Sequence, residues 1–401
     1  SWKRKLERNW GRLGMKYKLS DICSFRKGKV EVENLNTKNY ISTENMLPNK
    51  CGIIKASSLP SVALTQEYKN GDILVSNIRP YFKKIWKAKY DGGCSNDVLV
   101  FVAKSNTDRN FLYYVLADDN FFTYSMTTSK GTKMPRGDKT SIMQYEVPMI
   151  DLQTQKKIAS ILKSFDEKIE LNNVINNNLE QQAQSIFKYW FVDFEPFGKK
   201  IPTDWCNGTI DDLAKDIVCG KTPSTKKADY YGTDIPFITI PDMHDKIYSI
   251  TTERYLSVLG ANSQAKKNLP KNSICVSCIG TAGLVTLVAE ESQTNQQINS
   301  IIPKDGFSPY FIYLLMQTLS DTINKLGQGG STIVNLNKSQ FAKIQVTIPA
   351  IPAMTDFDKI VSPIFEKILQ NQKENLCLTS LRDNLLSKLM SGELDVSNID
   401  F

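Results

Sequence analysis

Residues suited to catalysis are few in this chain. The 401 residues include a single histidine, His244, which leaves little basis for imidazole acid–base chemistry or a histidine-dependent triad. Of the eight cysteines, only Cys275 and Cys278 have the close spacing of metal ligands, and a zinc site needs a second such pair or histidines. Both lie in an apolar run at residues 274–279, which is typical of a buried strand. We expect no metal site, and reduced thiols of the kind found in cytoplasmic proteins.

Loops that bind nucleotide cofactors are also missing from the sequence. Residues 220–222 (GKT) lack the upstream glycine of a phosphate-binding loop, and Gly280 and Gly283 lie between two expected strands without a suitably placed acid. The acidic pairs at residues 211–212 and 290–291 suit the first turn of a helix and a solvated turn. The chain is therefore predicted to be non-catalytic and to hold no cofactor of its own.

Basic segments favour a different chemistry. Residues 79–89 hold five positive charges and three aromatic side chains without an acid, and residues 130–139 form a loop rich in lysine and arginine. Residues 220–227 and 329–338 are their counterparts in the second half of the chain. Lysine and arginine neutralise phosphates, whereas arginine, asparagine and hydroxyl side chains can recognise base edges. Any one of these basic segments could simply be a solvated surface. Because such segments recur at similar places in both halves, a surface that binds nucleic acid is favoured.

Total charge is a weaker guide than clustering. The net charge is +8, and the first 14 residues carry +4 of it, so the rest of the chain contributes only +4. With 41% hydrophobic and 23% charged residues, the composition is that of an ordinary globular chain of two or three domains. No apolar run reaches the roughly 18 residues of a membrane span, and no secretory leader opens the sequence. These features predict a cytoplasmic protein.

The sequence contains two similar halves, offset by about 200 residues. Residues 71–76 (GDILVS) match residues 272–277 (NSICVS), and residues 110–116 (NFLYYVL) match residues 310–316 (YFIYLLM). A period this long exceeds the roughly 20–50 residues of solenoid repeats, so it indicates duplication of a whole domain. Two related domains in one chain suit a two-sided ligand, such as duplex DNA with two half-sites.

Each half is predicted to be a mixed strand and helix domain, which places the chain in the α/β (α+β) class. The expected strands are apolar segments, and the run at 97–102 is apolar enough to be buried on both faces. The expected strands are 73–75, 97–102, 234–240, 272–279 and 282–289, and the expected helices are 111–122 and 310–324. Residues 146–150 close the first domain, and Pro148 marks its boundary.

Two long helices are predicted to follow the two domains. The first begins near Leu152 and continues for about 35 residues, or roughly 50 Å. The second spans about residues 356–390, and Pro363 is expected to kink or shorten its first turns. A stretch rich in proline and glycine at residues 194–205 predicts a short, stiff linker before the second domain.

Asparagines interrupt the apolar seam of both helices. Asn172 and Asn176 occupy seam positions in the first helix, and Asn371 and Asn375 repeat them in the second. Polar seam positions fix register at a cost in stability. Antiparallel, coiled-coil-like packing of the two helices is the simplest arrangement. The alternative is that each helix packs separately on its own domain.

Several segments resemble type I restriction–modification specificity subunits, the HsdS family. Residues 148–172 (PMIDLQTQKKIASILKSFDEKIELN) and 179–197 resemble the central region of that family, and residues 381–393 resemble its C-terminal end. Residues 220–224 (GKTPS) and 330–338 (GSTIVNLNK) resemble signatures of its target recognition domains.

The resemblance covers nearly the whole chain from about residue 16. It implies two target recognition domains, each recognising half of a split DNA site, and two antiparallel helices that hold them apart in a pseudo-two-fold repeat. It also implies that these helices dock two methyltransferase subunits, which bind S-adenosylmethionine and methylate adenine N6, while restriction and translocation subunits add cleavage. A helix of about 50 Å suits two contacts separated by one to two DNA turns of roughly 34–36 Å.

The chain departs from the family pattern in both copies. Thr154-Gln155 stands where the family usually has Glu-Gln, and residues 348–359 of the second copy lack the glutamine. This leaves open whether the two methyltransferase-docking surfaces are equivalent. Residues 25–29 (FRKGK) stand where residues 220–224 stand in the second domain, so the two domains are expected to recognise different half-sites.

These inferences divide the chain and select residues. The expected divisions are a basic extension (1–15), target recognition domain 1 (16–151), a central helix (152–195), target recognition domain 2 (196–352), a C-terminal helix (353–392) and a tail (393–401). The residues selected to bind DNA are Arg79, Lys83, Lys84, Lys133, Arg136, Lys139, Lys221, Thr222, Ser224, Lys226, Ser331, Thr332, Asn335 and Lys338. Those selected to dock the methyltransferase are Gln155, Ile158, Ile161, Arg382 and Leu386.

Two other classes of function stay open at this point. One is a helical scaffold or decoy specificity protein that does not recognise DNA, and the other is a stand-alone methyltransferase or nuclease with unrecognised motifs. Binding of S-adenosylmethionine by the chain alone distinguishes the last of these from a specificity subunit.

Overall fold

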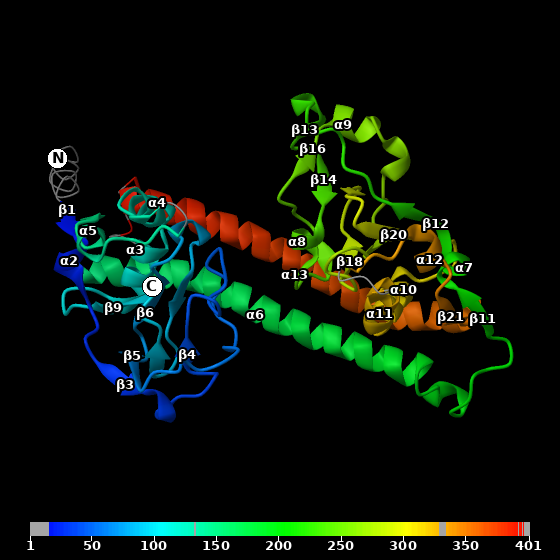
Figure 1. Ribbon diagram of the computed structural model, residues 1–401, viewed down its shortest axis with the longest axis horizontal. Helices are drawn as coiled ribbons and strands as arrows, with labels where there is room; N and C mark the ends of the chain where they lie inside the picture. The colour runs from blue at the N-terminus through cyan, green and yellow to red at the C-terminus, as the bar shows by residue number, and fades with distance from the viewer. Residues whose placement is uncertain (1–15, 132–133, 329–333, 392, 395, 397–401) are drawn as a thin grey trace. The chain divides into compact units, whose positions relative to one another are not determined.

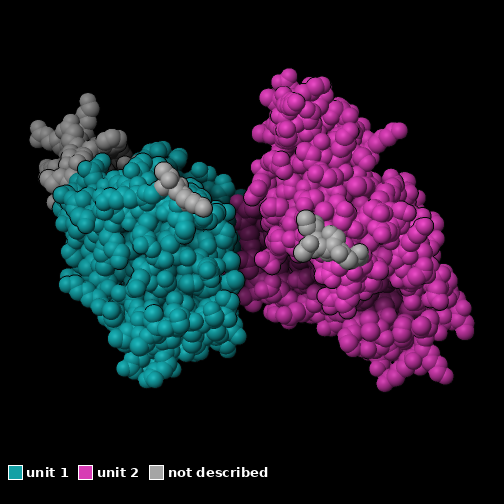
Figure 2. Space-filling view, in the orientation of Figure 1, with its two compact units in different colours: residues 1–169, 377–401 teal, residues 170–376 magenta. Residues whose placement is uncertain are grey.

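The computed structural model describes residues 16–131, 134–328, 334–391, 393–394 and 396. The chain forms two compact units, which are coloured separately in Figure 2. Unit 1 contains residues 1–169 and 377–401, and unit 2 contains residues 170–376. Each unit therefore combines a strand-rich part with segments of the two long helices.

Unit 1 contains three small sheets, with strand orders β2-β9-β6-β7, β3-β5-β8-β4 and β1-β10 (Figure 1). Its strands are β1 Lys16–Lys18, β2 Cys23–Phe25, β3 Lys29–Glu31, β4 Tyr40–Ile41, β5 Leu64–Tyr68, β6 Ile73–Ser76, β7 Ile85–Lys87, β8 Gly92–Cys94, β9 Val98–Ala103 and β10 Glu146–Pro148. Its short helices are α2 Leu19–Ile22, η1 Val32–Asn34, η2 Pro80–Phe82, α3 Arg109–Ala117, α4 Asp119–Thr127 and α5 Lys139–Ile142.

Unit 2 repeats this plan with a five-stranded sheet, β12-β20-β17-β18-β15, a four-stranded sheet, β13-β16-β14-β19, and the pair β11-β21. Its strands are β11 Cys206–Thr209, β12 Ala214–Cys219, β13 Tyr231–Gly232, β14 Ile235–Ile238, β15 Tyr248–Ser249, β16 Tyr255–Leu256, β17 Ile274–Ser277, β18 Val285–Val288, β19 Gln293–Thr294, β20 Ile298–Pro303 and β21 Gln345–Ile348. Its helices are η3 Glu195–Phe197, α7 Ile210–Leu213, η4 Ala228–Tyr230, α8 Ile240–Met243, α9 Val258–Asn262, η5 Ala265–Lys267, α10 Pro309–Thr318, α11 Ser320–Gln328 and α12 Lys338–Ala342.

The central sheet of unit 1 is buried on both faces, as the apolar run at 97–102 predicts. Ile73 and Val75 of β6 pack with α3 and α4 in one apolar cluster. Leu74, between them in sequence, packs on the opposite face with residues of the second sheet, such as Tyr68. Alternate side chains of a strand point to opposite faces, so every residue of β6 is apolar except its last.

The duplication is confirmed at the level of strand register. In unit 1, β6 pairs antiparallel with β9 from Ile73 opposite Phe101 to Ser76 opposite Val98. In unit 2, β17 and β20 pair from Ile274 opposite Ile301 to Ser277 opposite Ile298, which is the same register.

Three predicted elements need correction. The segments expected as helices 111–122 and 310–324 are each two helices. In unit 1 the break is at Asp118, whose backbone is extended and whose side chain accepts a hydrogen bond from the Asn120 amide, so a new helix starts there. The expected strand 234–240 ends at Ile238, because Thr239 and Asp242 form a capping box that begins α8.

The second long helix is longer than predicted and is not interrupted by proline. α13 spans Ile351–Ser391 and includes Pro363. Proline has no amide hydrogen for the carbonyl four residues earlier. The neighbouring Val361 and Phe365 are fully buried in the core of unit 2, and this packing holds the helix together on either side of the missing hydrogen bond.

The two long helices contact each other in antiparallel order, which confirms the prediction. α6 spans Leu152–Phe191. In unit 2, the Asn172 side-chain amide donates to the side-chain oxygen of Asn375 at 2.9 Å, and Asn371 donates to Asn176 at 2.8 Å. Residues earlier in α6 thus meet residues later in α13. The asparagines expected in the seam pair with one another, because their amides would otherwise be buried without partners.

The Asn176–Asn371 pair yields a stability prediction. Asn371→Leu leaves the buried Asn176 oxygen without its donor, and we expect a loss of about 1–3 kcal/mol in the free energy of unfolding. The double change Asn176→Leu with Asn371→Leu is expected to recover most of this loss, because two apolar groups then face each other. Urea denaturation of the full chain measures both.

The neighbouring Asn177 provides a matched control for this pair, since its side chain is exposed. Asn177→Leu should change the unfolding free energy by less than about 0.5 kcal/mol. Strictly additive effects of the two changes at Asn176 and Asn371 would contradict the proposed coupling between them.

Two further features bear on function. Cys275 and Cys278 are buried and free, and burial raises the pKa of their thiols to about 12 and about 11. Across the described residues, none of the helices combines the length and apolar character needed to traverse a membrane.

Candidate nucleic-acid interface

Three segments of unit 1 meet at the end of strand β6, and we call this meeting point the unit 1 junction. They are the turn at residues 77–79, Asp97 just before β9, and the loop 130–138 between α4 and α5, apart from residues 132–133. The Asn77 amide donates to the Asp97 carbonyl at 2.8 Å. The Arg79 amide donates to the Pro135 carbonyl at 2.9 Å, and a β-bridge joins Ile78 to Arg136. The basic loop is therefore fixed to the central sheet by its backbone.

Arg136 presents its guanidinium at this junction. Its side chain is 58% exposed and forms an ion pair with the Asp97 carboxylate. Asp138 caps α5 by accepting from the Ser141 amide, and this hydrogen bond together with that of Lys130 lowers the pKa of Asp138 to about 2. Two carboxylates of the junction, Asp97 and Asp138, are thus paired with Arg136 and Lys130, while the Arg136 side chain stays accessible to a ligand.

The structure places the other selected residues of unit 1 in different settings. Arg79 adopts a left-handed backbone conformation at the junction, and its Nε atom is buried without a hydrogen-bond partner. Lys139 is exposed at the start of α5. Lys133 lies outside the described residues.

Lys83 and Lys84 are not the free cations that the sequence suggests. Lys83 forms an ion pair with Asp119 at 2.7 Å, and the Lys84 ammonium donates to the Thr43 carbonyl at 2.6 Å. Burial lowers the pKa of Lys84. Both side chains therefore stabilise unit 1, and a role in binding phosphate would require them to leave these partners.

Two exposed aromatic side chains lie in the same segment and were not selected from the sequence. Tyr81 and Phe82 are 48% and 37% exposed, and their ring centroids are 4.6 Å apart. They immediately follow Arg79 and Pro80. The sequence could have indicated these two residues, because residues 79–89 hold three aromatic side chains among five positive charges. Exposed rings beside cations are common in nucleic-acid surfaces.

Unit 2 has an equivalent junction at the end of strand β17. The Cys278 amide donates to the Gln297 carbonyl at 2.8 Å, and the Gly280 amide donates to the Val334 carbonyl at 3.0 Å. A β-bridge joins Ile279 to Asn335. These are the same three contacts as in unit 1. Asn335 is exposed, whereas Ser331 and Thr332 lie outside the described residues.

The glycine-led loop of unit 2 reaches the same junction. The Lys221 amide donates to the Thr294 carbonyl at 2.9 Å, and the Thr222 hydroxyl donates to the Gln296 side chain at 2.7 Å. Gln296 adjoins Gln297 of the junction. The loop that carries Lys221 and Thr222 is therefore held beside the segment that carries Asn335.

The remaining selected residues of unit 2 have separate settings. Ser224 and Lys226 are exposed further along the same loop. Lys338 forms a 3.4 Å ion pair with Asp216 of β12. Of the described residues selected in unit 2, the structure brings Lys221, Thr222 and Asn335 to the junction and gives no contact that joins the other three to it.

The residues selected to dock a partner are mostly interior. Gln155, Ile158 and Leu386 are each less than 5% exposed in unit 1. Gln155 accepts a hydrogen bond from the Asp108 amide at 2.9 Å, and Arg382 forms an ion pair with Asp166 at 2.6 Å. These side chains hold unit 1 together, and a role in docking a partner stays a prediction at these positions. Ile161 is partly buried against the same core.

Other helix positions carry the exposed apolar side chains. Leu171 and Val174 of α6, in unit 2, are 52% and 50% exposed, and Leu381 of α13, in unit 1, is 50% exposed. The sequence pattern marks apolar seam positions, but it does not distinguish the side of a helix that meets its neighbour from a side left open.

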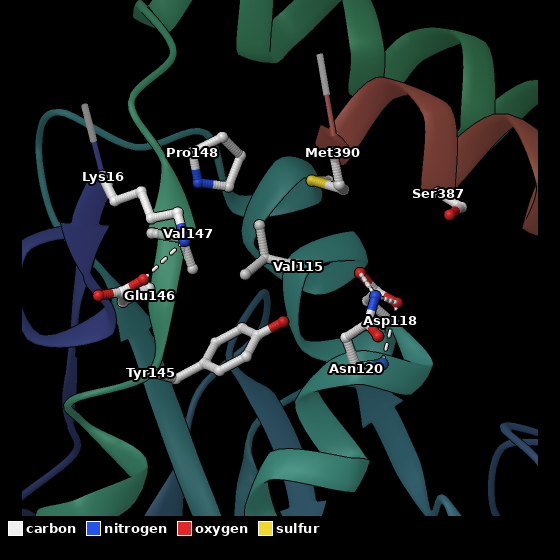
Figure 3. Close-up of a pocket in the computed structure, with 10 residues that line it drawn as sticks. All are labelled: Lys16, Val115, Asp118, Asn120, Tyr145, Glu146, Val147, Pro148, Ser387 and Met390. Carbon is white, nitrogen blue, oxygen red and sulfur yellow. Dashed lines mark hydrogen bonds and ion pairs between the residues drawn. The ribbon is translucent and has the colours of Figure 1, made fainter. Parts of the chain in front are cut away.

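Unit 1 also contains two cavities. Figure 3 shows one of about 350 Å³, between the α3–α4 connection, β10 and the last turns of α13. Lys16 and Glu146 form a 2.7 Å ion pair at its edge, and the Tyr145 hydroxyl points toward the side where Asp118 and Asn120 lie. None of its lining residues belongs to the unit 1 junction.

The second cavity touches the unit 1 junction. It has a volume of about 390 Å³ and includes Asp97 and Ser95 in its lining, together with hydroxyl-bearing residues such as Ser42 and Thr43. Asp97 thus separates a polar hollow from the Arg136 side chain. Within the described part of the chain, no group of three or more histidine, cysteine or acidic residues is arranged to hold a metal ion.

A duplicated domain with matching polar junctions is the arrangement expected of a DNA sequence-specificity protein, and comparisons with known proteins agree. A family model described as the type I restriction modification DNA specificity domain matches residues 14–181 and again residues 202–377. The HindI specificity subunit of Haemophilus influenzae is 34% identical over 94% of this chain and 99% of that protein. The chain belongs to the type I restriction–modification specificity family.

Two further comparisons extend this result. The MjaIX specificity subunit of Methanocaldococcus jannaschii is 27% identical over 74% of this chain and 72% of that protein. A crystal structure of the type I restriction–modification S subunit from M. genitalium covers 96% of both chains with a TM-score of 0.60 at 18% identity. The likeness to the S subunit shows a shared fold.

Proposed function

We propose that this chain selects the target of an adenine-N6 DNA methyltransferase complex, with each unit contacting one half of a split duplex site. The observation that carries the proposal is the pair of equivalent junctions, which have the same backbone contacts but different exposed side chains. Equivalent backbones position two side chains alike, and different side chains favour different base pairs.

The catalytic parts are proposed to come from other subunits. Two methyltransferase subunits would bind S-adenosylmethionine, and restriction subunits could add cleavage. The exposed Leu171, Val174 and Leu381 on the long helices are the candidate contacts for these partners, because large exposed apolar side chains often mark protein interfaces. A complex that acts on cellular DNA would work in the cytoplasm.

Methylation mapping tests this function. We expect the chain together with the methyltransferase subunit of its host to methylate adenines within a single split motif with a fixed spacer, read by sequencing a plasmid library. The chain alone should neither methylate DNA nor bind S-adenosylmethionine. Binding of that cofactor by the chain alone would indicate an enzyme. A complex that assembles but shows no sequence preference would indicate a scaffold or decoy.

A further inference from the structure

Arg136 and Asn335 occupy the same position in the two units. Each forms the β-bridge to the second residue after the central strand, Ile78 in unit 1 and Ile279 in unit 2. The amide one residue further along each turn donates to the carbonyl just before Arg136 or Asn335. The amide just after each, in Gly137 and Leu336, donates back at 3.1 and 2.9 Å.

The equivalence continues beyond these two residues. Asp138 and Asn337 follow two residues later, and each caps a short helix with its side chain, α5 in unit 1 and α12 in unit 2. Both Arg136 and Asn335 are exposed. A fixed backbone that carries an exposed side chain suits recognition of a ligand. The loop is already ordered, so binding costs little conformational entropy.

The residue just before strand β9 in unit 1 and just before strand β20 in unit 2 also differs between the units. In unit 1, one carboxylate oxygen of Asp97 forms an ion pair with Arg136. The equivalent residue of unit 2 is Gln297, whose side-chain oxygen accepts a hydrogen bond from the Asn295 side chain at 3.0 Å. A guanidinium has five N–H donors, so an edge remains for a ligand when one donor is held by a carboxylate. Asp97 thus restricts the direction in which Arg136 points.

The geometry points to Arg136 and Asn335 as the matched specificity-determining residues of the two units, which recognise a guanine and an adenine respectively, with Asp97 as the positioning residue for Arg136. Arginine forms paired hydrogen bonds with guanine O6 and N7, and asparagine does so with adenine N6 and N7. This inference rests on the proposed function, because it assigns bases within the two half-sites.

Single substitutions test the assignment in the complex with the methyltransferase subunit. Arg136→Ala should lower discrimination for one guanine in one half-site by about 5- to 150-fold and leave the other half-site unchanged. Asn335→Ala should do the same for one adenine in the other half-site. The readout is the methylation rate on a library in which each motif position is varied in turn.

Two further variants separate recognition from general weakening. Arg136→Lys keeps the charge but not the planar pair of donors, so guanine discrimination should fall while affinity for DNA is largely retained. Lys139→Ala, at an exposed neighbouring position, should weaken binding to all sequences alike, as loss of a phosphate contact does. Asp97→Asn should reduce discrimination at the Arg136 position without reducing affinity, because a negative charge near DNA is removed.

The outcomes also distinguish this inference from the proposed function. Absence of any split motif in the unaltered complex would overturn the proposed function. A split motif whose base preferences are the same in Arg136→Ala, Arg136→Lys and Asn335→Ala would overturn the base assignment alone. Equal loss at every motif position would overturn it as well, since that result indicates a structural role.

Discussion

Asp166→Ala is expected to lower the unfolding free energy of unit 1 by about 2–4 kcal/mol. The Asp166 carboxylate joins α6 to two neighbours: Arg382 of α13, at 2.6 Å, and the hydroxyl of Tyr114 in α3, also at 2.6 Å. The Arg382 side chain is only 17% exposed. Removing the carboxylate leaves a largely buried guanidinium with Asp383 as its remaining acid and a buried hydroxyl without its acceptor.

Burial, and then the Asp166 carboxylate, raises the pKa of Tyr114, so its hydroxyl stays protonated and continues to donate at all ordinary pH values. Urea denaturation of the full chain, followed by a signal from unit 1, measures the effect. The double change Asp166→Ala with Arg382→Met should recover part of the loss, because the largely buried guanidinium is then absent and the carboxylate that loses its partner, Asp383, is 46% exposed.

Glu167 offers a control one residue away. It forms an exposed ion pair with Lys163 at 2.7 Å on the surface of the same helix. Glu167→Ala should cost less than about 1 kcal/mol, which is usual for exposed pairs. An effect of Asp166→Ala no larger than that of Glu167→Ala would show that the network does not hold the two helices together in unit 1.

Gly220→Ala is expected to abolish most recognition by unit 2. A Cβ atom at Gly220 would lie 2.1 Å from the Asn295 carbonyl oxygen and 2.5 Å from that of Thr294. These carbonyl oxygens belong to the backbone and cannot rotate away as a side chain can. The loop that carries Gly220 must therefore move. That movement breaks the Lys221 and Thr222 hydrogen bonds, and overpacking of this kind costs about 1–3 kcal/mol of stability.

The expected functional result is at least about a tenfold loss in recognition of one half-site, since each good base contact contributes about 1–3 kcal/mol. Methylation of the varied library by the complex measures it. Gly28→Ala is the matched control in the corresponding loop of unit 1, because the three atoms nearest to a Cβ there belong to the flexible side chain of Glu67 rather than to backbone. Equal effects of the two substitutions would argue against a backbone clash as the cause.

The sequence predicts the duplication and the two helices because they depend on patterns that survive divergence. The strands β6 and β17 keep four consecutive positions of similar character, and each must be apolar on both faces of a covered sheet. The seam asparagines are also visible, since they repeat at the same spacing and interrupt an otherwise apolar stripe.

The equivalence of Arg136 and Asn335 is less evident in the sequence. The central strands are related by a shift of 201 residues, as Ile78 and Ile279 show, but Arg136 and Asn335 are related by a shift of 199. The intervening segments differ in length, and the aligned side chains differ in type. A shift of 199 also relates the seam asparagines and the basic segments 130–139 and 329–338, and the backbone hydrogen bonds between the loop and the turn then identify Arg136 and Asn335 as counterparts.

The burial of the residues selected to dock a partner could not be predicted from the sequence either. Gln155, Ile158 and Leu386 lie in segments that resemble the family, and a residue in such a segment can pack inside the domain or contact a partner. Burial decides between these roles, and it depends on which elements cover the helix. The break between α3 and α4 was missed because an aspartate in a polar stretch can continue a helix or cap the next one.

The division of the chain into units has a consequence for its biosynthesis. Unit 2 is one continuous stretch, 170–376, whereas unit 1 needs residues from both sides of it. Leu386 and Leu389, which are nearly the last residues of α13, fill the apolar cluster of unit 1. During translation, residues 1–169 of unit 1 therefore keep an apolar face uncovered while unit 2 is synthesised and folds. Unit 1 can close only after Leu386 and Leu389 have been made, so a nascent chain stalled before Leu386 is expected to be a target for chaperones and proteases.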